Sequence, residues 1–272
     1  METGRVEGDG RRALGGVEFA FSETGQGPPV LLIHETAAAA AIWDELVAGL
    51  AGKARTIAYD RRGWGGSSAP EGYARTTVSE QAEDAARLLD SFGAGRAAVC
   101  GAGLGAVVAL DLMLRHPETL SAALLIEPPL LAFLTEATEG LSADREEISE
   151  AVRTGGAPAG LDLYLGGALP FIGAGAERIP AEVAAVARTR PLTLFAEIGA
   201  VPAWSIRPRD LAAVRIPSRL VTGTSTPTVL RRCAGELAER LGSCEPLEVE
   251  CGGDLPHVGA APRLGEELSR LG

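Results

Sequence analysis

The turn GAGLG at residues 101–105 lies between a predicted apolar strand and a predicted apolar helix. In the spacing G-x-S-x-G, this strand–turn–helix presents a serine that attacks a carbonyl carbon. The central residue in this chain is Gly103, which has no side chain with which to attack. Covalent catalysis by a serine is therefore excluded at this turn. The chain is either a protein that has lost its catalytic activity or one that catalyses a reaction without a serine nucleophile.

Carboxyl groups and a histidine near the ends of predicted strands could transfer protons instead. In an apolar pocket, desolvation raises the pKa of a carboxyl group and makes it a usable general acid or base. Glu127 and Glu35 also have purely structural interpretations, as a partner for an arginine and as a solvated loop residue. The candidates for catalytic residues are Asp254, Glu127, His257 and Glu35.

Backbone groups around Gly103 are expected to form a site for a developing negative charge. The amides of Leu104 and of Glu35 or Thr36 should converge there. The helix that begins at Leu104 points its positive end at the same place. Such a hole stabilises an oxyanion or an enolate without a nucleophile beside it. A glycine at 103 also leaves extra room for a substrate.

The elements that position these residues alternate along the chain. Near-continuous apolar strands separated by helices are typical of a parallel sheet covered on both faces. One helix begins with the capping box formed by Thr77 and Glu80. Strands are predicted at 17–23, 30–34, 56–60, 97–101, 121–127, 218–223 and 246–250.

Residues 130–205 interrupt this alternation with helical patches and Gly-rich turns. We expect this segment to fold as a cap over the carboxyl ends of the strands, where ligands bind in open α/β sheets. A cap must line its pocket with apolar side chains. The candidates are Phe133, Tyr164, Phe171 and Trp204.

Five segments in this order resemble the α/β-hydrolase superfamily along almost the whole chain, from about 17 to 272. They are VLLIH, YDRRGWGGSS, CGAGLG, LLIEPP and GGDLPH. The resemblance implies an α/β-hydrolase fold: a mostly parallel central sheet with helices on both faces and a helical cap inserted after the sixth strand. The core would comprise 1–129 and 206–272, the cap 130–205, and the whole would be one domain.

The resemblance also implies a catalytic triad, which is degenerate here. Relatives usually carry G-x-G-H-x-P-H after the last strand, with the first histidine as the base. This chain reads GGDLPH at 252–257, which places Asp254 at the base position and His257 at the second, non-catalytic histidine. An alternative alignment makes His257 the base, although it lies three residues further from the strand.

The other triad positions depart from the family pattern as well. The acid usually follows the seventh strand, where GTSTP at 223–227 has no carboxylate. Glu127 matches an alternative acid site that some relatives use. Where relatives have His-Gly in the oxyanion loop, this chain has His34 and Glu35. The resemblance therefore assigns the oxyanion and substrate-binding site to Leu104, Gly103, Thr36 and His34.

Composition excludes several other classes of protein. A net charge of −11 argues against nucleic acid, because phosphate binding needs a basic face. No stretch approaches the roughly 18 apolar residues of a membrane span, and the N-terminus lacks the apolar region of a signal peptide. The four cysteines form no C-x-x-C pair, so we expect no metal site and reduced thiols in a cytoplasmic protein. Lys53 is the only lysine among 25 basic residues, a bias typical of a GC-rich bacterial genome.

These observations predict a cofactor-independent enzyme that acts on a hydrophobic small molecule without a serine nucleophile. A lyase, isomerase or cyclase of bacterial secondary metabolism, monomeric or homodimeric, would use general acid–base groups and the oxyanion hole. One alternative is a catalytically dead ligand-binding or receptor protein. A second is an atypical hydrolase that uses carboxylate-activated water or a carboxylate nucleophile. In every case Gly103 should have a positive φ and should lie beneath residues 130–205.

Overall fold

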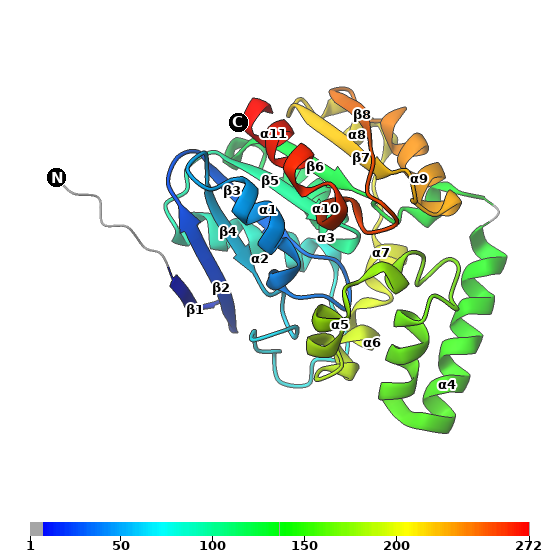
Figure 1. Cartoon of the computed structure of the whole chain (residues 1–272). Coiled ribbons are helices and arrows are strands. Elements are labelled where there is room, and N and C mark those ends of the chain that lie inside the picture. Colours follow the sequence, from blue (N-terminus) through cyan, green and yellow to red (C-terminus); the bar gives the residue numbers. More distant parts are fainter. Residues whose placement is uncertain (1–7, 136, 272) are drawn as a thin grey trace.

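The computed structural model describes residues 8–135 and 137–271, which form one mixed eight-stranded sheet. The strand order is β1-β2-β4-β3-β5-β6-β7-β8, in which β2 is antiparallel to β1 and β4 and all other pairs are parallel. Figure 1 shows the sheet crossed on both faces by helices. The strands are β1 (Gly8–Leu14), β2 (Val17–Gly25), β3 (Pro29–Ile33), β4 (Arg55–Tyr59), β5 (Ala97–Ala102), β6 (Leu120–Ile126), β7 (Ser218–Gly223) and β8 (Cys244–Val249).

The edge strand β1 is the one strand that the sequence analysis did not predict. It pairs with β2 through a two-residue turn in which Leu14 is opposite Val17. Gly15 and Gly16 form this turn with φ values of 57° and 83°. Positive φ at both central residues is the requirement of a type I′ hairpin turn, which Gly-Gly meets without strain. The Gly-Gly pair between two short segments was therefore the signal for a hairpin.

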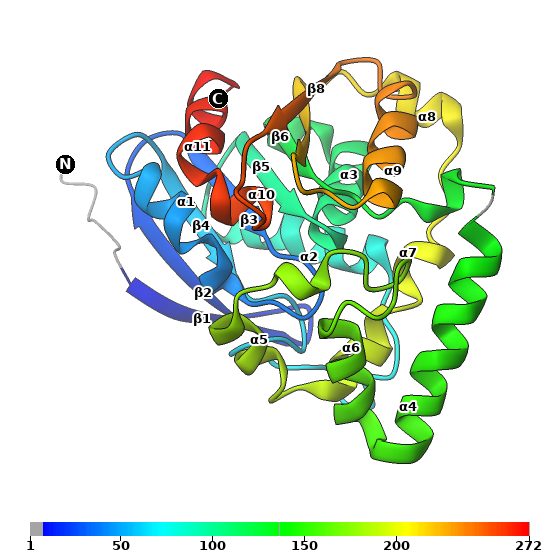
Figure 2. The same cartoon turned by 45° about the vertical axis from the view of Figure 1, so that its right-hand side comes forward.

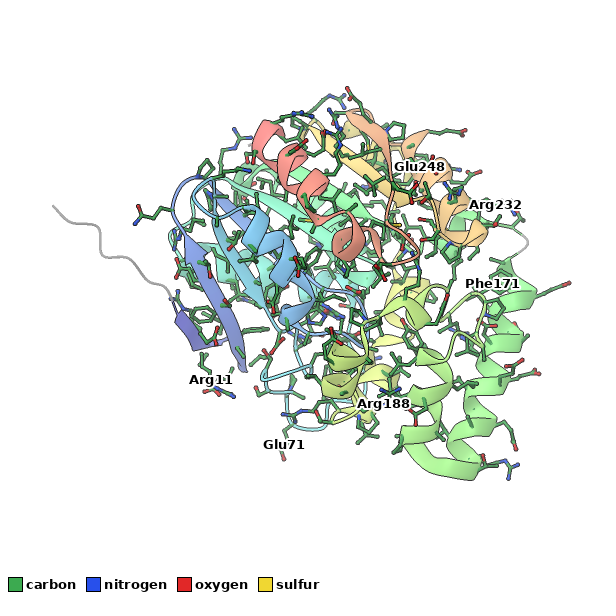
Figure 3. All side chains as sticks on the ribbon, viewed as in Figure 1. Arg11, Glu71, Phe171, Arg188, Arg232 and Glu248 are labelled. Carbon is green, nitrogen blue, oxygen red and sulfur yellow. The ribbon has the colours of Figure 1, made fainter. Side chains whose placement is uncertain are left out.

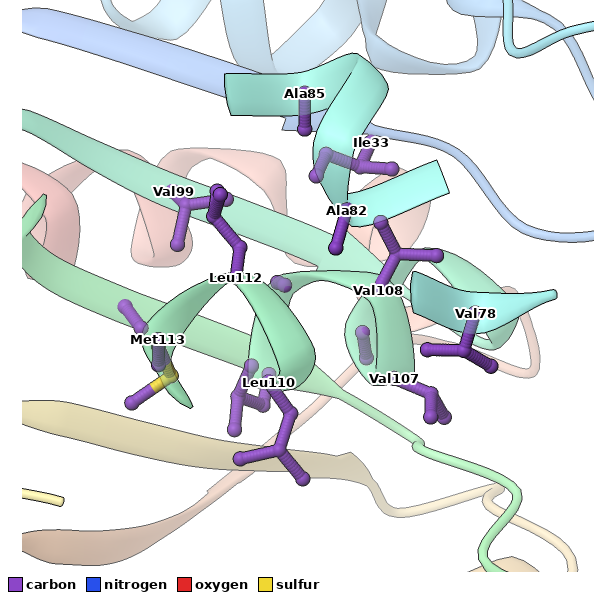
Figure 4. Close-up of a cluster of buried hydrophobic side chains, with 14 of the residues drawn as sticks. Ile33, Val78, Ala82, Ala85, Val99, Val107, Val108, Leu110, Leu112 and Met113 are labelled. Atoms are coloured by element: carbon purple, nitrogen blue, oxygen red, sulfur yellow. The ribbon is translucent and has the colours of Figure 1, made fainter. Parts of the chain in front are cut away.

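Alternate residues of the central strands pack against helices on opposite faces of the sheet, as the period of two requires. Leu31, Ile33 and Val99 belong to a core cluster with α2 and α3, whereas Leu32 and Cys100 belong to a second cluster with α1 and α11. Figure 4 shows Ile33 and Val99 against residues of α2 and α3. The helices that flank the sheet are α1 (Asp44–Gly49), α2 (Val78–Ser91), α3 (Leu104–Arg115), α8 (Pro208–Ala213), α9 (Thr228–Ala238), α10 (Pro256–Gly259) and α11 (Ala261–Leu271).

Helix α2 begins at the predicted position. The hydroxyl of Thr77 accepts a hydrogen bond from the backbone N–H of Glu80 at 3.0 Å. The carboxylate of Glu80 does not complete the capping box, because it accepts from Thr76 and pairs with Arg62 instead. Thr77 therefore caps the helix, whereas Glu80 connects the helix to the loop after β4.

The segment between β6 and β7 contains helices and no strand among its described residues. Its longest helix turns back on itself at Gly156, which has a φ of 73°, two residues before Pro158. Figures 1 and 2 show these helices together on one side of the molecule. We call residues 130–205 the cap segment. It comprises α4 (Ala137–Leu165), α5 (Ala181–Ala187), α6 (Pro191–Glu197) and α7 (Ala200–Ala203), with short 3-10 turns between them.

None of the helices in 8–135 and 137–271 is both long enough and apolar enough to span a bilayer.

Candidate active site

Gly103 lies at a sharp turn between β5 and α3, where its φ is 53° and its ψ is −122°. The prediction of a positive φ at this position is confirmed. The neighbouring glycines allow the tight packing of the turn: a Cβ at Gly105 would lie 2.1 Å from the carbonyl oxygen of Ile33. The chain therefore keeps the backbone of a nucleophile elbow while its central residue has no side chain.

The side chain of Glu35 occupies the space beside this turn. A Cβ built on Gly103 would lie 2.7 Å from the Cβ of Glu35, closer than real Cβ atoms approach other atoms. Glu35 follows β3 directly after His34, and it is 8% exposed. Glycine at 103 and glutamate at 35 are therefore sterically matched, because a larger residue at 103 requires Glu35 to move.

A cavity of about 460 Å³ lies between this turn and the cap segment. Its size is within the range of small-molecule sites. The cap segment covers Gly103, as predicted, and supplies nearly two thirds of the lining, including Phe171, which Figure 3 labels beside α4. Of the residues predicted from sequence, those that line the cavity are Glu35, Thr36, Gly103, Leu104, Glu127, Tyr164, Phe171 and His257.

Glu35 and His257 form a close buried pair at this cavity. Nε2 of His257 lies 3.3 Å from Oε1 of Glu35, and their side chains are 1% and 11% exposed. Neither the two carboxylate oxygens nor the two ring nitrogens have a hydrogen-bond partner among the described residues. The imidazole packs against Trp43, with the ring centroids 4.6 Å apart. The pair thus combines close approach of an acidic and a basic side chain with unused hydrogen-bonding capacity.

Glu127 borders the same cavity with most of its hydrogen-bonding capacity used. Nη1 and Nη2 of Arg178, from the cap segment, donate to its two oxygens at 3.1 and 2.6 Å. The hydroxyl of Thr226 donates to Oε1 as well. The structural interpretation of Glu127, as a partner for an arginine, is the one that the contacts support. Glu127 reaches this position with a φ of 47°, an uncommon value for a residue other than glycine.

The loop that carries Glu35 is held by a buried network around Arg61. Arg61 donates to the carbonyl oxygens of His34 and Glu35 at 2.8 and 3.0 Å. It also pairs with Glu197 of the cap segment, and the hydroxyl of Thr36 donates to Glu197 at 3.0 Å. The network therefore connects the expected oxyanion loop to α6.

His34 belongs to this network and not to the cavity lining. Its Nδ1 is 2.7 Å from the carbonyl oxygen of Glu35, and Nε2 accepts from the backbone N–H of Arg61 at 2.9 Å. A nitrogen that faces a carbonyl must donate and one that faces an N–H must accept, so this imidazole is neutral. Burial, together with the Arg61 charge, holds the pKa of His34 well below its usual value. His34 orients the loop and does not line the cavity.

Tyr164 brings a protonated phenol to the cavity. The residue is 9% exposed, and burial raises the pKa of its phenol far above the physiological range. Tyr164 can therefore donate a hydrogen bond but does not supply a phenolate.

The structure does not bring Asp254 to the site. Gly252 and Gly253 have φ values of 61° and 100°, and this turn leaves Asp254 exposed on the surface after β8. The chain then enters α10, which turns His257 inward. The assignment of Asp254 to the base position is therefore corrected: the alternative alignment, with His257 as the inward-facing residue, agrees with the geometry.

Two of the predicted cap residues lie elsewhere. Phe133 is absent from the lining and packs beneath the guanidinium of Arg240, 5.0 Å from its ring centroid. Trp204 donates from its indole N–H to Asp111 at 2.9 Å, which holds the ring against α3. Both aromatic residues therefore attach the cap segment to the core and leave the cavity to other side chains.

Arg178 and Glu197 are cavity residues that the sequence analysis missed. Each lies in the cap segment and pairs with a core residue that is far away in the sequence. Neither belongs to a motif, so only a contact map would have indicated them.

Comparison with known proteins agrees with this geometry. The family model for the alpha/beta hydrolase fold matches residues 28–152. A 2-(acetamidomethylene)succinate hydrolase of Mesorhizobium japonicum is 31% identical over 174 residues, which cover 62% of this chain and 59% of that protein. Epoxide hydrolase A of Mycobacterium tuberculosis is 34% identical over 119 residues, which cover 43% of this chain and 37% of that protein.

Solved structures match over nearly the whole chain. A thermophilic esterase from Thermogutta terrifontis superposes with a TM-score of 0.75 at 21% identity, and the match covers 97% of each chain. The eight-stranded, mostly parallel sheet and these matches define an α/β fold with a helical cap segment. The chain has the α/β-hydrolase fold. The chain spans less than two thirds of the length of the curated relatives named above, so their activities enter below only as proposals.

Proposed function

We propose that this chain is a cofactor-independent enzyme in which Glu35 and His257 transfer protons to and from a hydrophobic small molecule. The substrate carries a carbonyl or phenol group, and the reaction is a lyase, isomerase or cyclase type of conversion. The observation that carries the proposal is the buried pair at the cavity, 3.3 Å apart and without hydrogen bonds, beside a turn that has no nucleophile.

The cost of the pair supports a chemical role. Burying polar and charged groups without hydrogen bonds costs free energy, so proteins satisfy most of them. A protein that only binds an apolar ligand gains nothing from keeping Glu35 and His257 unsatisfied at its cavity. An acid–base catalyst gains a carboxylate and an imidazole that are free to exchange protons.

The geometry suggests which residue acts as the base, which groups stabilise the enolate and which residue returns the proton. Because its oxygens are covered, Glu35 must rotate into the cavity to take a proton from a carbon next to a carbonyl group. The backbone N–H groups of Leu104 and Thr36, at the start of α3 and on the oxyanion loop, stabilise the resulting enolate. His257 holds the second proton position and returns a proton to the product. Glu197 and Arg61 keep the oxyanion loop in place.

Proton exchange tests the proposal without knowledge of the natural reaction. Aryl ketones and β-diketones that raise the melting temperature of the protein are incubated with it in D₂O, and loss of their α-protons is followed by ¹H NMR. We expect the wild type to accelerate exchange and E35Q and H257Q to lose about 10²–10⁴-fold of that acceleration. D254N and H116Q are matched controls on the surface, and both should behave as the wild type.

Two outcomes would overturn this assignment. If no ketone that binds is exchanged faster than in buffer, the ligand-binding alternative replaces the enzyme. If D254N loses exchange while E35Q keeps it, the proton passes through Asp254 and our choice of residues is wrong.

A second candidate function is hydrolysis in which Glu35 attacks an electrophilic carbon. The contact between the Gly103 position and Glu35 supports it, because the carboxylate is beside the place where a nucleophile would stand. A relative named as an epoxide hydrolase also matches part of the chain. Attack by Glu35 on an epoxide carbon would break the ring C–O bond, form an ester and leave an alkoxide that takes up a proton. Water activated by His257 would then cleave the ester to a diol and restore the carboxylate. Single turnover of an aryl epoxide in H₂¹⁸O, followed by peptide mass spectrometry, would place ¹⁸O in Glu35 only in this case.

A further inference from the structure

The first half of α4 turns one face toward the mouth of the cavity. Thr138, Leu141, Ser142 and Arg145 all line the cavity, and their spacing of three, four and seven residues places them on one side of the helix. Thr138, Ser142 and Arg145 are exposed, so this face forms part of the rim where the cavity meets solvent. Three of these four side chains are therefore polar, and one of the three, Arg145, is a cation.

The wall next to this rim is apolar and firmly held. The carboxylate of Asp144 accepts the backbone N–H groups of Phe171 and Ile172 at 2.8 and 2.7 Å. The ring of Phe171 packs so closely on Gly140 that a Cβ there would lie 2.0 Å from it. A ligand at this end of the cavity thus meets a fixed apolar surface beside exposed hydroxyls and a guanidinium.

Arg145 is the cation that the cavity leaves without a carboxylate. Within the lining, Arg178 is paired with Glu127, Glu197 with Arg61, and His257 with Glu35. Among the described residues, no carboxylate pairs with Arg145. Arg153, eight residues further along the same helix, is by contrast paired with Glu150 at 2.9 Å and lies outside the cavity.

We propose that Arg145, with the hydroxyl of Thr138, binds a carboxylate at the outer end of the substrate. The substrate is then an amphipathic organic acid whose apolar body fills the cavity and whose carboxylate stays at the rim. A guanidinium presents parallel N–H donors that match a carboxylate. In a protein of net charge −11, a local cation is also what an acidic ligand needs at the entrance. This inference rests on the proposed function, because it names the substrate class of the same cavity.

Matched ligand pairs test the carboxylate site directly. The dissociation constants of ω-phenylalkanoates with two to six methylene groups are measured by calorimetry against those of the corresponding primary amides. We expect the wild type to prefer at least one acid over its amide by a few-fold to about tenfold, as for an exposed ion pair. R145Q should abolish this preference, R153Q should keep it, and 0.5 M salt should reduce it because salt screens exposed charges.

A wild type that binds no alkanoate more tightly than its amide would overturn the proposal, and so would an undiminished preference in R145Q. The same pairs measured with E35Q separate this inference from the proposed function. A preference that survives in E35Q, when proton exchange is absent, supports the carboxylate site alone. Proton exchange without any preference for acids supports the catalytic proposal alone.

Discussion

Two buried pairs, each of a glutamate with a basic side chain, border the cavity, and they differ in how many of their polar atoms make hydrogen bonds. The pair of Glu127 and Arg178 connects the core to the cap segment, and Glu127 accepts hydrogen bonds from both terminal nitrogens of Arg178 and from Thr226. The pair of Glu35 and His257 lies within the core, and its four polar atoms make no hydrogen bond among the described residues. Both carboxylates follow strands that end at the same edge of the sheet.

The difference distinguishes a pair that stabilises the fold from a pair that is able to exchange protons with a substrate. A carboxylate with most of its lone pairs engaged stabilises the fold and has little capacity left for a substrate. A carboxylate without partners contributes less to stability but can exchange a proton. His34 and His257 repeat the contrast, because both ring nitrogens of His34 are engaged and neither ring nitrogen of His257 is.

The largest expected effect is the loss of stability on breaking the satisfied pair. Glu127→Ala leaves the Arg178 guanidinium, 8% exposed, without its carboxylate. Removal of one partner of a buried pair costs about 3–5 kcal/mol. Urea unfolding followed by circular dichroism measures the loss. The double variant E127A/R178M should recover much of it, because no buried charge remains unpaired. A loss under about 1 kcal/mol in E127A would show that the pair is not structural.

The next effect tests the steric match between Gly103 and Glu35. Gly103→Ala adds a Cβ at positive φ, which costs about 1–3 kcal/mol, and places it 2.7 Å from the Cβ of Glu35. Gly93→Ala is the control, since its φ is 56° and a Cβ there meets nothing within 4 Å. We expect G103A to lose more stability than G93A in urea unfolding. In a double-mutant cycle, Glu35→Gly should recover only the part of the G103A loss that exceeds the G93A loss. Strictly additive losses would contradict the steric match between Gly103 and Glu35.

The sequence predicts the fold and the turn well, because local signals determine them. Strand 218–223 matches β7 residue for residue, and the GAGLG turn has the predicted positive φ at Gly103. The cap segment was visible as a break in the alternation of strands and helices. The edge strand β1 was missed, although Gly15 and Gly16 carried the signal of a hairpin turn.

The satisfied and unsatisfied groups of the site could not be predicted, because their partners are distant in sequence. Glu127 and Arg178 are 51 residues apart, and no motif connects them. Asp254 and His257 differ by one turn of chain, and only the backbone at Gly252 and Gly253 decides which one faces inward. Phe133 and Trp204 were reasonable lining residues by hydrophobicity alone. Their partners, Arg240 and Asp111, hold them elsewhere.

The third prediction uses pH to test whether His34 is a buried neutral group. The pKa of His34 is held below its usual value of about 6.5, so the unfolded chain binds more protons than the folded one as pH falls below that value. His34 therefore contributes stability that is fully present above about pH 6.5 and is lost as pH falls toward its folded pKa, by up to about 1.4 kcal/mol per pH unit. Urea unfolding between pH 7.5 and 5 should show a smaller slope for His34→Gln than for the wild type. An unchanged slope in H34Q would contradict the assignment of His34 as a buried neutral group.

The smallest expected effect is the most informative about the unsatisfied pair. Glu35→Gln preserves the size of the side chain and removes a buried charge that accepts no hydrogen bond. The variant loses the attraction to His257 but also the desolvation cost of the carboxylate, and these contributions oppose each other. We therefore expect the free energy of unfolding to change by less than about 1 kcal/mol in either direction. Asp254→Asn, at an exposed position, is the control: it shows how the free energy of unfolding changes when a carboxylate with no structural or catalytic role is removed. If Glu35→Gln instead destabilises the protein as much as Glu127→Ala, Glu35 holds the fold, and the contrast between the two pairs no longer identifies the residue that reacts.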